Sequence, residues 1–475
     1  MTYGRFIVSA LGGGSGKTIL SIGLIAALKK KHFSIVPFKK GPDYIDAGWL
    51  AYAAGRPCFN LDTFILSQDL ILRSFSSRTS PGDIAVIEGN RGLFDGIDLH
   101  GKTSTAELAK LLQAPVILAV DCTKTTRTMA AMILGLMHFD PNVAFGGIVL
   151  NRVAGSRHER ILTQTINHHC GIPVIGAVPK IPDKIFPERH MGLVPTPEHE
   201  WAKEAVEKTA LIAEQHIDLD AVVDIAGRHS ARPPHTAAIS GCTAEPSLQV
   251  EKARPCIGIF KDAAFQFYYP ENIDALKTAG ASVIFISPLS DDNLPDVDGL
   301  YIGGGFPETH AQKLSAGTAF KRRLKAMVKN GLPVYAECGG LMYLGESLVI
   351  NDSTYPMAGV LPAVFGISEK PQGLGYTVAC VDKPNPFLEV GTVFKGHEFH
   401  YSNVLKWFGT EDQLVFHMQR GAGFLYGRDG VCIKNVLAAY THIHTLGLPA
   451  WASSLVSNAL SFMKKKKSSH ELSAL

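Results

Sequence analysis

Short apolar runs rich in β-branched residues alternate with helix-periodic segments from residue 1 to about residue 225. This alternation predicts a parallel sheet with helices on both faces, because each parallel crossover needs a helix between successive strands. The predicted strands are residues 6–11, 34–38, 84–88, 116–120, 145–151 and 174–178. The predicted helices are residues 19–30, 105–112, 126–137, 159–170 and 198–215.

A second alternating pattern follows residues 229–254, which lack a sustained period and are rich in Pro, Ser, Ala and Thr. We interpret that stretch as an interdomain linker. Beyond it the pattern predicts strands at 256–260, 282–286, 299–302 and 333–336, helices at 273–279 and 320–330, a strand-rich part to about 440 and a helix at 451–463. We therefore expect two doubly wound α/β domains, residues 1–228 and 255–463, and a basic tail, 464–475, that is disordered.

Composition excludes several function classes. The 475 residues include 46 Lys and Arg against 43 Asp and Glu, so no overall field attracts nucleic acid or an anionic membrane. The eight cysteines form no C-x-x-C pair, which argues for a reducing compartment. The sequence has no signal-peptide pattern and no uncharged apolar run of about 18 residues. We expect a soluble cytoplasmic protein that binds small molecules and neither nucleic acid nor membrane.

A glycine-rich turn connects the first predicted strand to the first predicted helix. Its backbone N–H groups and the helix N-terminus would hold phosphates, while Lys17 reaches the outer phosphates and the Thr18 hydroxyl ligates Mg²⁺. Leu11 departs from the generic P-loop, which has glycine at that position. The segment predicts a bound nucleoside triphosphate; its residues are Gly12, Gly13, Gly14, Ser15, Gly16, Lys17 and Thr18.

Acidic side chains follow two of the predicted strands. Glu88 ends the strand at 84–88, and a second acidic strand of this kind delivers a carboxylate to the magnesium of a P-loop domain. Asp43 and Asp46 come just after the second strand, at the sheet edge where ligands bind. Asp95 follows Glu88 at loop distance. As a group, these carboxylates predict a metal and phosphoryl-transfer site.

A cysteine occupies a second strand-to-helix turn in the C-terminal half. Cys338 follows a buried-looking strand and precedes Gly339, Gly340 and a helical run. Small neighbours let the chain bend there, and a following helix N-terminus lowers the pKa of a thiol. The pattern predicts a nucleophilic cysteine.

Two further segments complete the requirements of acyl transfer. Gly304 and Gly305 end another strand and can offer N–H donors to an oxyanion. His442 and His444 lie on one face of an extended segment, far along the chain from the cysteine. A cysteine and a distant histidine are what a thiol-dependent acyl transfer needs. A metal-binding pair is the alternative interpretation of the two histidines.

These motifs together resemble a known family. The chain is similar to the cobyrinic acid a,c-diamide synthases, the a,c-diamide synthases of tetrapyrrole biosynthesis, from about residue 5 to about residue 450. The resemblance implies an ATP-dependent ligase whose N-terminal half is similar to dethiobiotin synthetase and whose C-terminal half is similar to class I glutamine amidotransferases. It also accounts for Leu11, since this P-loop branch does not keep the first glycine. The matching segments are residues 12–18, 38–46, 87–96, 187–193, 303–308, 337–341, 396–402 and 440–444.

The resemblance also implies roles for individual residues. Cys338 corresponds to the thiol nucleophile and His442 to its base. Triad amidotransferases carry glutamate two positions after the base, where this chain has His444, so the assignment of the base to His444 stays open. Arg189 suits a substrate carboxylate, because guanidinium binds carboxylate in a bidentate way. The remaining implied roles are magnesium ligation by Thr18, Glu88 and Asp43, adenine recognition by Asn151, carboxylate activation by Asp46 and Asp95, and substrate binding by Tyr44, Arg189, His190, Gly304 and Gly305.

The implied activity is ATP-dependent, glutamine-hydrolysing amidation of the a and c acetate carboxylates of cobyrinic acid, in cobalamin biosynthesis, through a phosphorylated carboxylate. The same chemistry on sirohaem, nickel sirohydrochlorin or hydrogenobyrinic acid is an alternative. A more distant alternative is a P-loop ATPase switch with a non-catalytic C-terminal module. A monomer and a homodimer are both open.

Overall fold

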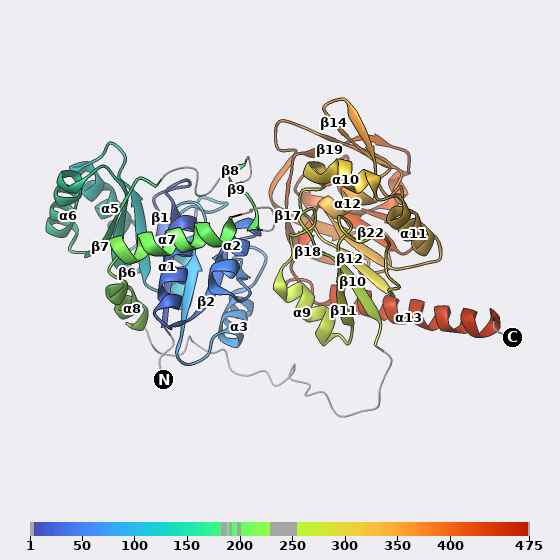
Figure 1. The fold of residues 1–475 in the computed structure, drawn as a ribbon, viewed down its shortest axis with the longest axis horizontal. Helices are drawn as coiled ribbons and strands as arrows, with labels where there is room; N and C mark the ends of the chain where they lie inside the picture. Colours follow the sequence, from blue (N-terminus) through green and yellow to red (C-terminus); the bar gives the residue numbers. More distant parts are fainter. Residues whose placement is uncertain (1–3, 182–187, 190–191, 197–200, 229–253, 474–475) are drawn as a thin grey trace. The chain divides into compact units, whose positions relative to one another are not determined.

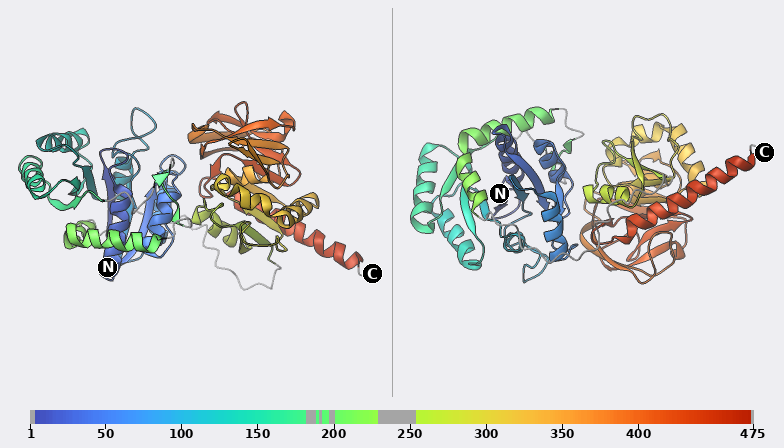
Figure 2. Two further views of the ribbon diagram at one scale, coloured as in Figure 1. Left: turned by 45° about the horizontal axis from the view of Figure 1, so that its top comes forward. Right: turned by 90° about the horizontal axis from the view of Figure 1, so that it is seen from below.

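The computed structural model describes residues 4–181, 188–189, 192–196, 201–228 and 254–473. The chain divides into two compact units, residues 1–240 and 241–475. Figures 1 and 2 show the helices and strands of each unit. The predicted linker lies outside the described residues except for Arg254.

The first unit contains one seven-stranded sheet in the order β3-β2-β4-β1-β5-β6-β7, and every neighbouring pair is parallel. Its central strands are apolar and buried along almost their whole length, as expected of parallel strands covered on both faces. The strands are β1 (Gly4–Ala10), β2 (Ser34–Lys40), β3 (Phe59–Leu61), β4 (Asp83–Glu88), β5 (Val116–Asp121), β6 (Phe145–Val153) and β7 (Val174–Pro179), with a separate pair β8 (Glu188–Arg189) and β9 (Gly192–Leu193).

Helices flank this sheet, and α1 packs against α2 and α7. Three of the eight helices described in this unit, α2, α3 and α8, were not predicted, and neither was strand β3. Strand β3 is too short to show a period, and α2 begins inside the acidic segment that we read as a loop. The helices are α1 (Lys17–Lys30), α2 (Ile45–Ala54), α3 (Gln68–Arg78), α4 (Thr105–Leu112), α5 (Arg127–Phe139), α6 (Ser156–Cys170), α7 (Ala202–His216) and α8 (Leu219–Gly227).

The second unit is built on a ten-stranded sheet in the order β11-β10-β12-β13-β22-β21-β20-β17-β18-β23. The first five strands are mutually parallel and the rest pair antiparallel. A smaller sheet has the order β15-β14-β16-β19. The strands are β10 (Cys256–Phe260), β11 (Ser282–Ile286), β12 (Gly299–Ile302), β13 (Val334–Glu337), β14 (Ser347–Ile350), β15 (Ser353–Pro356), β16 (Ala363–Ile367), β17 (Gly373–Val381), β18 (Val393–His400), β19 (Ser402–Trp407), β20 (Leu414–Arg420), β21 (Arg428–Ile433), β22 (Val436–Ala439) and β23 (His442–Ile443).

Both faces of the parallel part are covered. Along β13, Val334 belongs to the core on one face, while Tyr335 belongs to the core on the other face, where it packs against Trp451 of α13. This alternation follows from the two-residue period of a strand. The helices of this unit are α9 (Pro270–Thr278), α10 (Ala311–Ala316), α11 (Thr318–Lys329), α12 (Gly339–Leu344) and α13 (Ala450–Ser473), with short 3₁₀ turns η2 (Pro307–His310) and η3 (Glu411–Gln413).

Helix α13 corrects the expected end of the second domain. We predicted that the helix ends at residue 463 and that a disordered tail follows, but α13 continues to Ser473. The added part contains no Gly or Pro, and Lys466 donates to Asp296 and Asp298 at 2.9 Å each. Those ion pairs hold the basic segment against the second unit. No helix among the described residues is long and apolar enough to cross a membrane.

Candidate functional site

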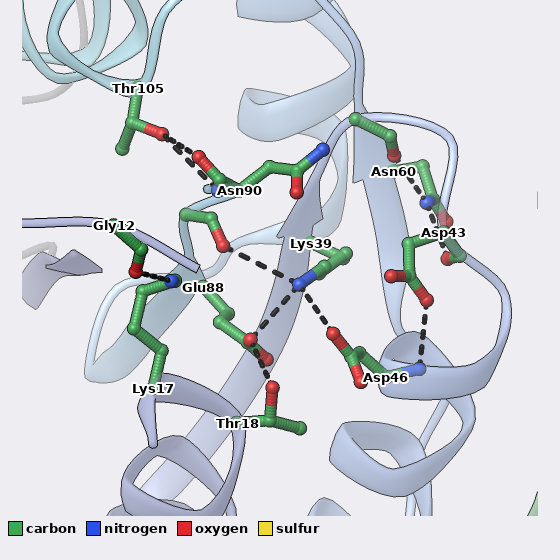
Figure 3. A network of polar contacts seen from close by, with 12 residues as sticks. Gly12, Lys17, Thr18, Lys39, Asp43, Asp46, Asn60, Glu88, Asn90 and Thr105 are labelled. Atoms are coloured by element: carbon green, nitrogen blue, oxygen red, sulfur yellow. Dashed lines mark hydrogen bonds and ion pairs between the residues drawn. The ribbon is translucent and has the colours of Figure 1, made fainter. Parts of the chain in front are cut away.

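The glycine-rich turn lies between β1 and α1, as predicted. Gly14 and Gly16 have φ values of 71° and 86°, in the left-handed region that favours glycine. The Ser15 hydroxyl and the Lys17 ammonium both donate to the carbonyl of Gly12, at 3.0 and 3.2 Å. Figure 3 shows Lys17 folded back over the turn toward Gly12. The geometry is suited to holding a phosphate at the start of α1.

Sheet register brings the acidic strand to this turn. Glu88, the last residue of β4, pairs with Val8 of β1 on one side and with Lys39 of β2 on the other. The Thr18 hydroxyl donates to Glu88 Oε1 at 2.7 Å, and the Lys39 ammonium donates to the same oxygen at 2.9 Å. Lys39 also donates to Asp46 Oδ2 at 2.9 Å (Figure 3). One buried ammonium therefore holds two carboxylates beside the phosphate turn.

Charge sets the protonation of this cluster. Burial opposes charge on Lys39, but Asp46 and Glu88 raise the pKa of its ammonium above the usual value. Burial raises the pKa of Glu88, and the charge of Asp46 adds to that effect. Burial also acts on Asp46, but Lys39 and neighbouring hydrogen bonds hold the pKa of that carboxyl below its usual value. The cluster keeps a fixed positive charge between its carboxylates.

The oxygen donors fit a magnesium ion shared with phosphates. Thr18 and Glu88 supply hard oxygens in contact with each other, and Glu88 Oε2 is buried without a hydrogen-bond partner. The described residues contain no group of three or more His, Cys, Asp or Glu arranged for a metal. Asp43, the predicted third ligand, accepts the backbone N–H of Asp46 at 2.8 Å.

Asn151 lies beside the turn at the end of β6. Its Nδ2 donates to Ser15 O at 2.9 Å, and its Oδ1 accepts the N–H of Arg152 at 2.9 Å. A Cβ on Gly16 would collide with Asn151 Nδ2, so the turn and the asparagine pack closely. A cavity of about 660 Å³ opens here between α1, β6, β7 and α7. Its polar lining includes Thr123, Asn151, Arg152 and Lys180, and its volume suits a nucleoside.

The other predicted residues of the first unit differ in their exposure and in the elements that carry them. Asp95 is exposed and accepts the N–H of Gly92 at 2.8 Å. Burial lowers the pKa of Lys17, and the negative charge of Asp95 acts in the other direction. Tyr44 is half-buried at the start of α2. Arg189 pairs in β8 with Gly192 of β9. His190 lies outside the described residues. Lys39 was not predicted, although a lysine ending an apolar strand beside acidic residues was a visible signal.

Cys338 occupies the tight turn predicted between β13 and α12. Its φ and ψ are 47° and −100°, a left-handed conformation rare for a residue other than glycine. A Cβ on Gly340 would lie 2.5 Å from Ile302 O, so glycine is required there for close packing. The expected lowering of the thiol pKa was wrong: burial raises the pKa of Cys338, Glu308 adds to this, and the N–H of Gly339 opposes it only in part. The thiol therefore needs a base.

The predicted histidine and glycines gather around this turn. Gly304 lies against His442, because a Cβ there would be 2.5 Å from His442 Cε1 and 3.3 Å from His442 Nε2. The N–H of Gly305 lies 3.0 Å from the place a Cβ on Gly339 would take. The turn after β12 therefore contacts both the cysteine turn and the imidazole.

The two histidines have different surroundings. His442 Nδ1 lies 3.4 Å from Glu337 Oε2, and the His442 ring stacks on that of His397 at 4.8 Å. His444 is fully buried; its Nδ1 accepts the N–H of Leu446 at 3.2 Å, and its Nε2 faces Glu271 Oε1 at 3.7 Å. Both nitrogens of His444 thus face protein groups. This geometry favours His442 as the base, and neither histidine belongs to a group of three or more His, Cys, Asp or Glu arranged for a metal among the described residues.

Buried polar contacts hold the segment that carries His442. The Asp429 carboxylate accepts the N–H groups of Tyr440 and Thr441 at 3.0 and 2.9 Å. The Tyr440 ring stacks on His400 at 3.7 Å, with 9° between the planes. Burial acts against ionisation of Glu398, but His400 and two backbone N–H groups hold the pKa of Glu398 below its usual value. These contacts explain why the matching segment 396–402 lies beside the histidine.

Comparison with known proteins matches a known domain family to each half of the chain. Residues 6–193 match the CobQ/CobB/MinD/ParA nucleotide binding domain, and residues 256–449 match the CobB/CobQ-like glutamine amidotransferase domain. The chain is 41% identical to the cobyrinate a,c-diamide synthase of Magnetococcus marinus over 451 residues, covering 94% of this chain and 95% of that protein. The chain belongs to the cobyrinate a,c-diamide synthase family.

Other members of the family are similar over the same extent. The synthase of Archaeoglobus fulgidus is 39% identical, covering 98% of this chain and 99% of that protein. The synthase of Methanosarcina acetivorans is 37% identical, covering 96% of each chain. Membership makes the protein a glutamine-dependent carbon–nitrogen ligase that binds ATP and works in cobalamin synthesis. The alternative of an ATPase switch with a non-catalytic C-terminal module is therefore wrong.

Proposed function

We propose that this ligase amidates the a and c acetate carboxylates of cobyrinic acid, using ATP, Mg²⁺ and glutamine. The observation that carries the proposal is the pairing, in one chain, of the charged phosphate turn with the Cys338 turn, at full-length similarity to proteins named cobyrinate a,c-diamide synthase. The names of those relatives support cobyrinic acid as the substrate, and the two sites support the two half-reactions.

In the first half-reaction, a substrate carboxylate oxygen attacks the γ-phosphorus of ATP, forming an acyl phosphate and releasing ADP. The glycine-rich turn and Lys17 hold the phosphates, and Asn151 lines the nucleoside cavity. Thr18 and Glu88 would hold Mg²⁺, which neutralises charge on the phosphate oxygens when bound. We assign Asp46 and Asp95 to the carboxylate-activating end, Asp43 to a supporting position, and Tyr44, Arg189 and His190 to binding of the macrocycle.

In the second half-reaction, the Cys338 sulfur attacks the carboxamide carbon of glutamine while His442 accepts the thiol proton. Collapse of the adduct, with a proton from His442, releases ammonia and leaves a thioester that water hydrolyses to glutamate. Gly304 and Gly305 would donate N–H groups to the oxyanion. Ammonia then attacks the acyl carbon of the acyl phosphate, expels phosphate and forms the amide.

Mass spectrometry of the products tests this proposal. The protein would be incubated with ATP, Mg²⁺ and glutamine and one member of a panel: cobyrinic acid, hydrogenobyrinic acid, sirohydrochlorin, nickel sirohydrochlorin or sirohaem. Each conversion of a carboxyl to an amide lowers the mass by about one unit, since amino replaces hydroxyl. We expect a loss of about two units with cobyrinic acid. A loss confined to another macrocycle would reject cobyrinic acid as the substrate.

A further inference from the structure

Glu337 is a fully buried carboxylate next to the candidate nucleophile. It ends β13, and the alternation of that strand turns it to the same face as Tyr335. A buried carboxylate needs hydrogen-bond donors around it. Its Oε1 accepts the backbone N–H of Ile443 at 3.1 Å, and its Oε2 lies 3.1 Å from the Tyr301 hydroxyl and 3.4 Å from His442 Nδ1.

The direction of these hydrogen bonds follows from one asparagine. Asn272 Oδ1 accepts the N–H of Thr445 at 2.8 Å, and Asn272 Nδ2 donates to the carbonyl of Ile443 at 3.0 Å, so the amide has one orientation. Nδ2 also donates to the Tyr301 oxygen at 3.1 Å. The Tyr301 hydrogen is therefore free to point only toward Glu337. Both carboxylate oxygens of Glu337 act as acceptors in this chain of contacts.

An accepting oxygen beside an imidazole nitrogen selects the imidazole tautomer. Glu337 Oε2 lies 3.4 Å from His442 Nδ1, an ion-pair distance without the geometry of a hydrogen bond, and a carboxylate oxygen on that side of the ring favours a proton on Nδ1. Nε2 then keeps its lone pair, on the ring edge that lies against Gly304. We propose that Glu337 is the positioning residue of the glutaminase site, holding His442 with Nδ1 protonated and Nε2 as the base for the Cys338 thiol. This inference rests on the proposed function.

The second buried histidine–glutamate pair provides a matched control. His444 Nε2 lies 3.7 Å from Glu271 Oε1, and both side chains are as buried as the first pair. His444 Nδ1, however, accepts the N–H of Leu446, which assigns the proton to Nε2. The two pairs thus hold their imidazoles in opposite tautomers, and only His442 adjoins the glycine turn at the cysteine.

Kinetics of two glutamine substitutions test the proposal. In Glu337→Gln the N–H of Ile443 still requires an oxygen, so the amide nitrogen must take the place of Oε2 and donate toward His442. The imidazole should switch tautomer and lose its base at Nε2. We expect glutaminase kcat to fall about 10²- to 10⁴-fold, with KM for glutamine within about threefold and ammonia-dependent amidation retained. The kcat of Glu337→Asp should lie between those of Glu337→Gln and the wild type, and the kcat of Glu271→Gln should match that of the wild type.

A Glu337→Gln variant with glutaminase kcat within threefold of wild type would overturn the proposal. An equal loss of kcat in Glu271→Gln would overturn it too, because a general packing role would then explain both. If the wild type hydrolyses no glutamine, the proposed function fails instead. Tyr301→Phe removes one donor to Glu337 and should cost only a few-fold in kcat.

Imidazole ¹⁵N spectra provide a readout that does not depend on folding of any glutamate variant. The full chain would be labelled at histidine, and the His442 signals identified by their absence in His442→Asn. We expect the protonated-nitrogen shift at Nδ1 of His442 in the wild type. The opposite tautomer in the wild type would overturn the proposal even if turnover falls in Glu337→Gln.

Discussion

The phosphate turn (residues 12–18) and the thiol turn (residues 338–340) have similar backbone structures, but the groups that contact their carboxylates differ in charge. Each follows a buried parallel strand, contains at least one residue with a positive φ and opens a helix. At the phosphate turn, the Lys39 ammonium lies 2.9 Å from each of two carboxylates. At the thiol turn, Glu337 instead accepts hydrogen bonds from the Tyr301 hydroxyl and the backbone N–H of Ile443, and it lies beside the imidazole of His442.

This difference matches the chemistry that each turn has to support. Phosphoryl transfer moves negative charge over several oxygens, which fixed positive charges stabilise without moving a proton. Attack by a thiol requires a proton to leave the sulfur, and burial raises the pKa of Cys338. A fixed charge would not accept that proton, whereas a correctly oriented imidazole can. The contrast predicts that the two sites fail separately.

Removing the thiol should have the largest effect. We expect Cys338→Ala to lower glutamine-dependent amidation by about 10⁶-fold, since removal of a nucleophile disables the whole catalytic unit. Ammonia-dependent amidation should persist, because it does not use that site. Assays with glutamine and with ammonium chloride would measure both, and Cys380→Ala provides a cysteine control. Loss of both activities, or of neither, would contradict the separation of the two sites.

Removing the fixed charges should come next. Lys39→Met keeps the length of the side chain but leaves Glu88 and Asp46 facing each other without a cation. We expect it, and Lys17→Ala, to lower ATP-dependent synthesis by about 10³-fold while glutaminase activity survives. Coupled ADP release and glutamate formation would be measured in parallel. Lys110→Met, at an ion pair with Asp140, is the control. Undiminished synthesis in either variant would show that the substituted lysine is not needed for phosphoryl transfer.

A steric change at the thiol turn should have an intermediate effect. The Cβ of Gly304→Ala would lie 2.5 Å from His442 Cε1, so the imidazole must shift. Shifts of about 1 Å at a catalytic group cost about 10²-fold, and we expect that loss in glutaminase kcat. Gly135→Ala, where a Cβ would meet nothing within 4 Å, is the matched control. Equal rates for the two variants would mean that His442 lies elsewhere during turnover.

The smallest expected effect is a pH dependence of stability at the phosphate turn. Burial, together with the charge of Asp46, raises the pKa of Asp43 to about 7. Between pH 4 and 7 the folded protein keeps a proton that the unfolded chain has released, so this contribution to stability is complete below about pH 4 and is lost as pH rises to 7. The slope is about 1 kcal/mol per pH unit.

Urea unfolding of the nucleotide-free protein at pH 5 and pH 8 would measure this effect. The unfolding free energy should fall more between the two values in the wild type than in Asp43→Asn, which cannot ionise. The difference between the two proteins should appear in the unfolding of the first unit, because Asp43 lies in that unit. An equal pH dependence in the two proteins would mean that Asp43 is ionised throughout.

Sequence pattern alone predicted the two α/β domains, because the alternation of strand and helix follows from local periodicity. It also located both turns, since glycine spacing and a cysteine between a strand and a helix are local features. Helix α2 and strand β3 were missed because one begins within a polar motif and the other has only three residues. The continuation of α13 was missed because lysine runs resemble solvated tails, and the partners Asp296 and Asp298 are remote in sequence.

Only the tertiary structure decided which charges and protons meet. Register across β2, β4 and β1 places Lys39 beside Glu88, a contact between residues 49 apart that no local pattern encodes. The proposed choice of His442 over His444 rests on contacts with Glu337 and with the N–H of Leu446, which differ between two histidines that look equivalent in sequence. Motifs specify which groups are present, whereas burial and sheet pairing determine the ionisation and proton position of each group.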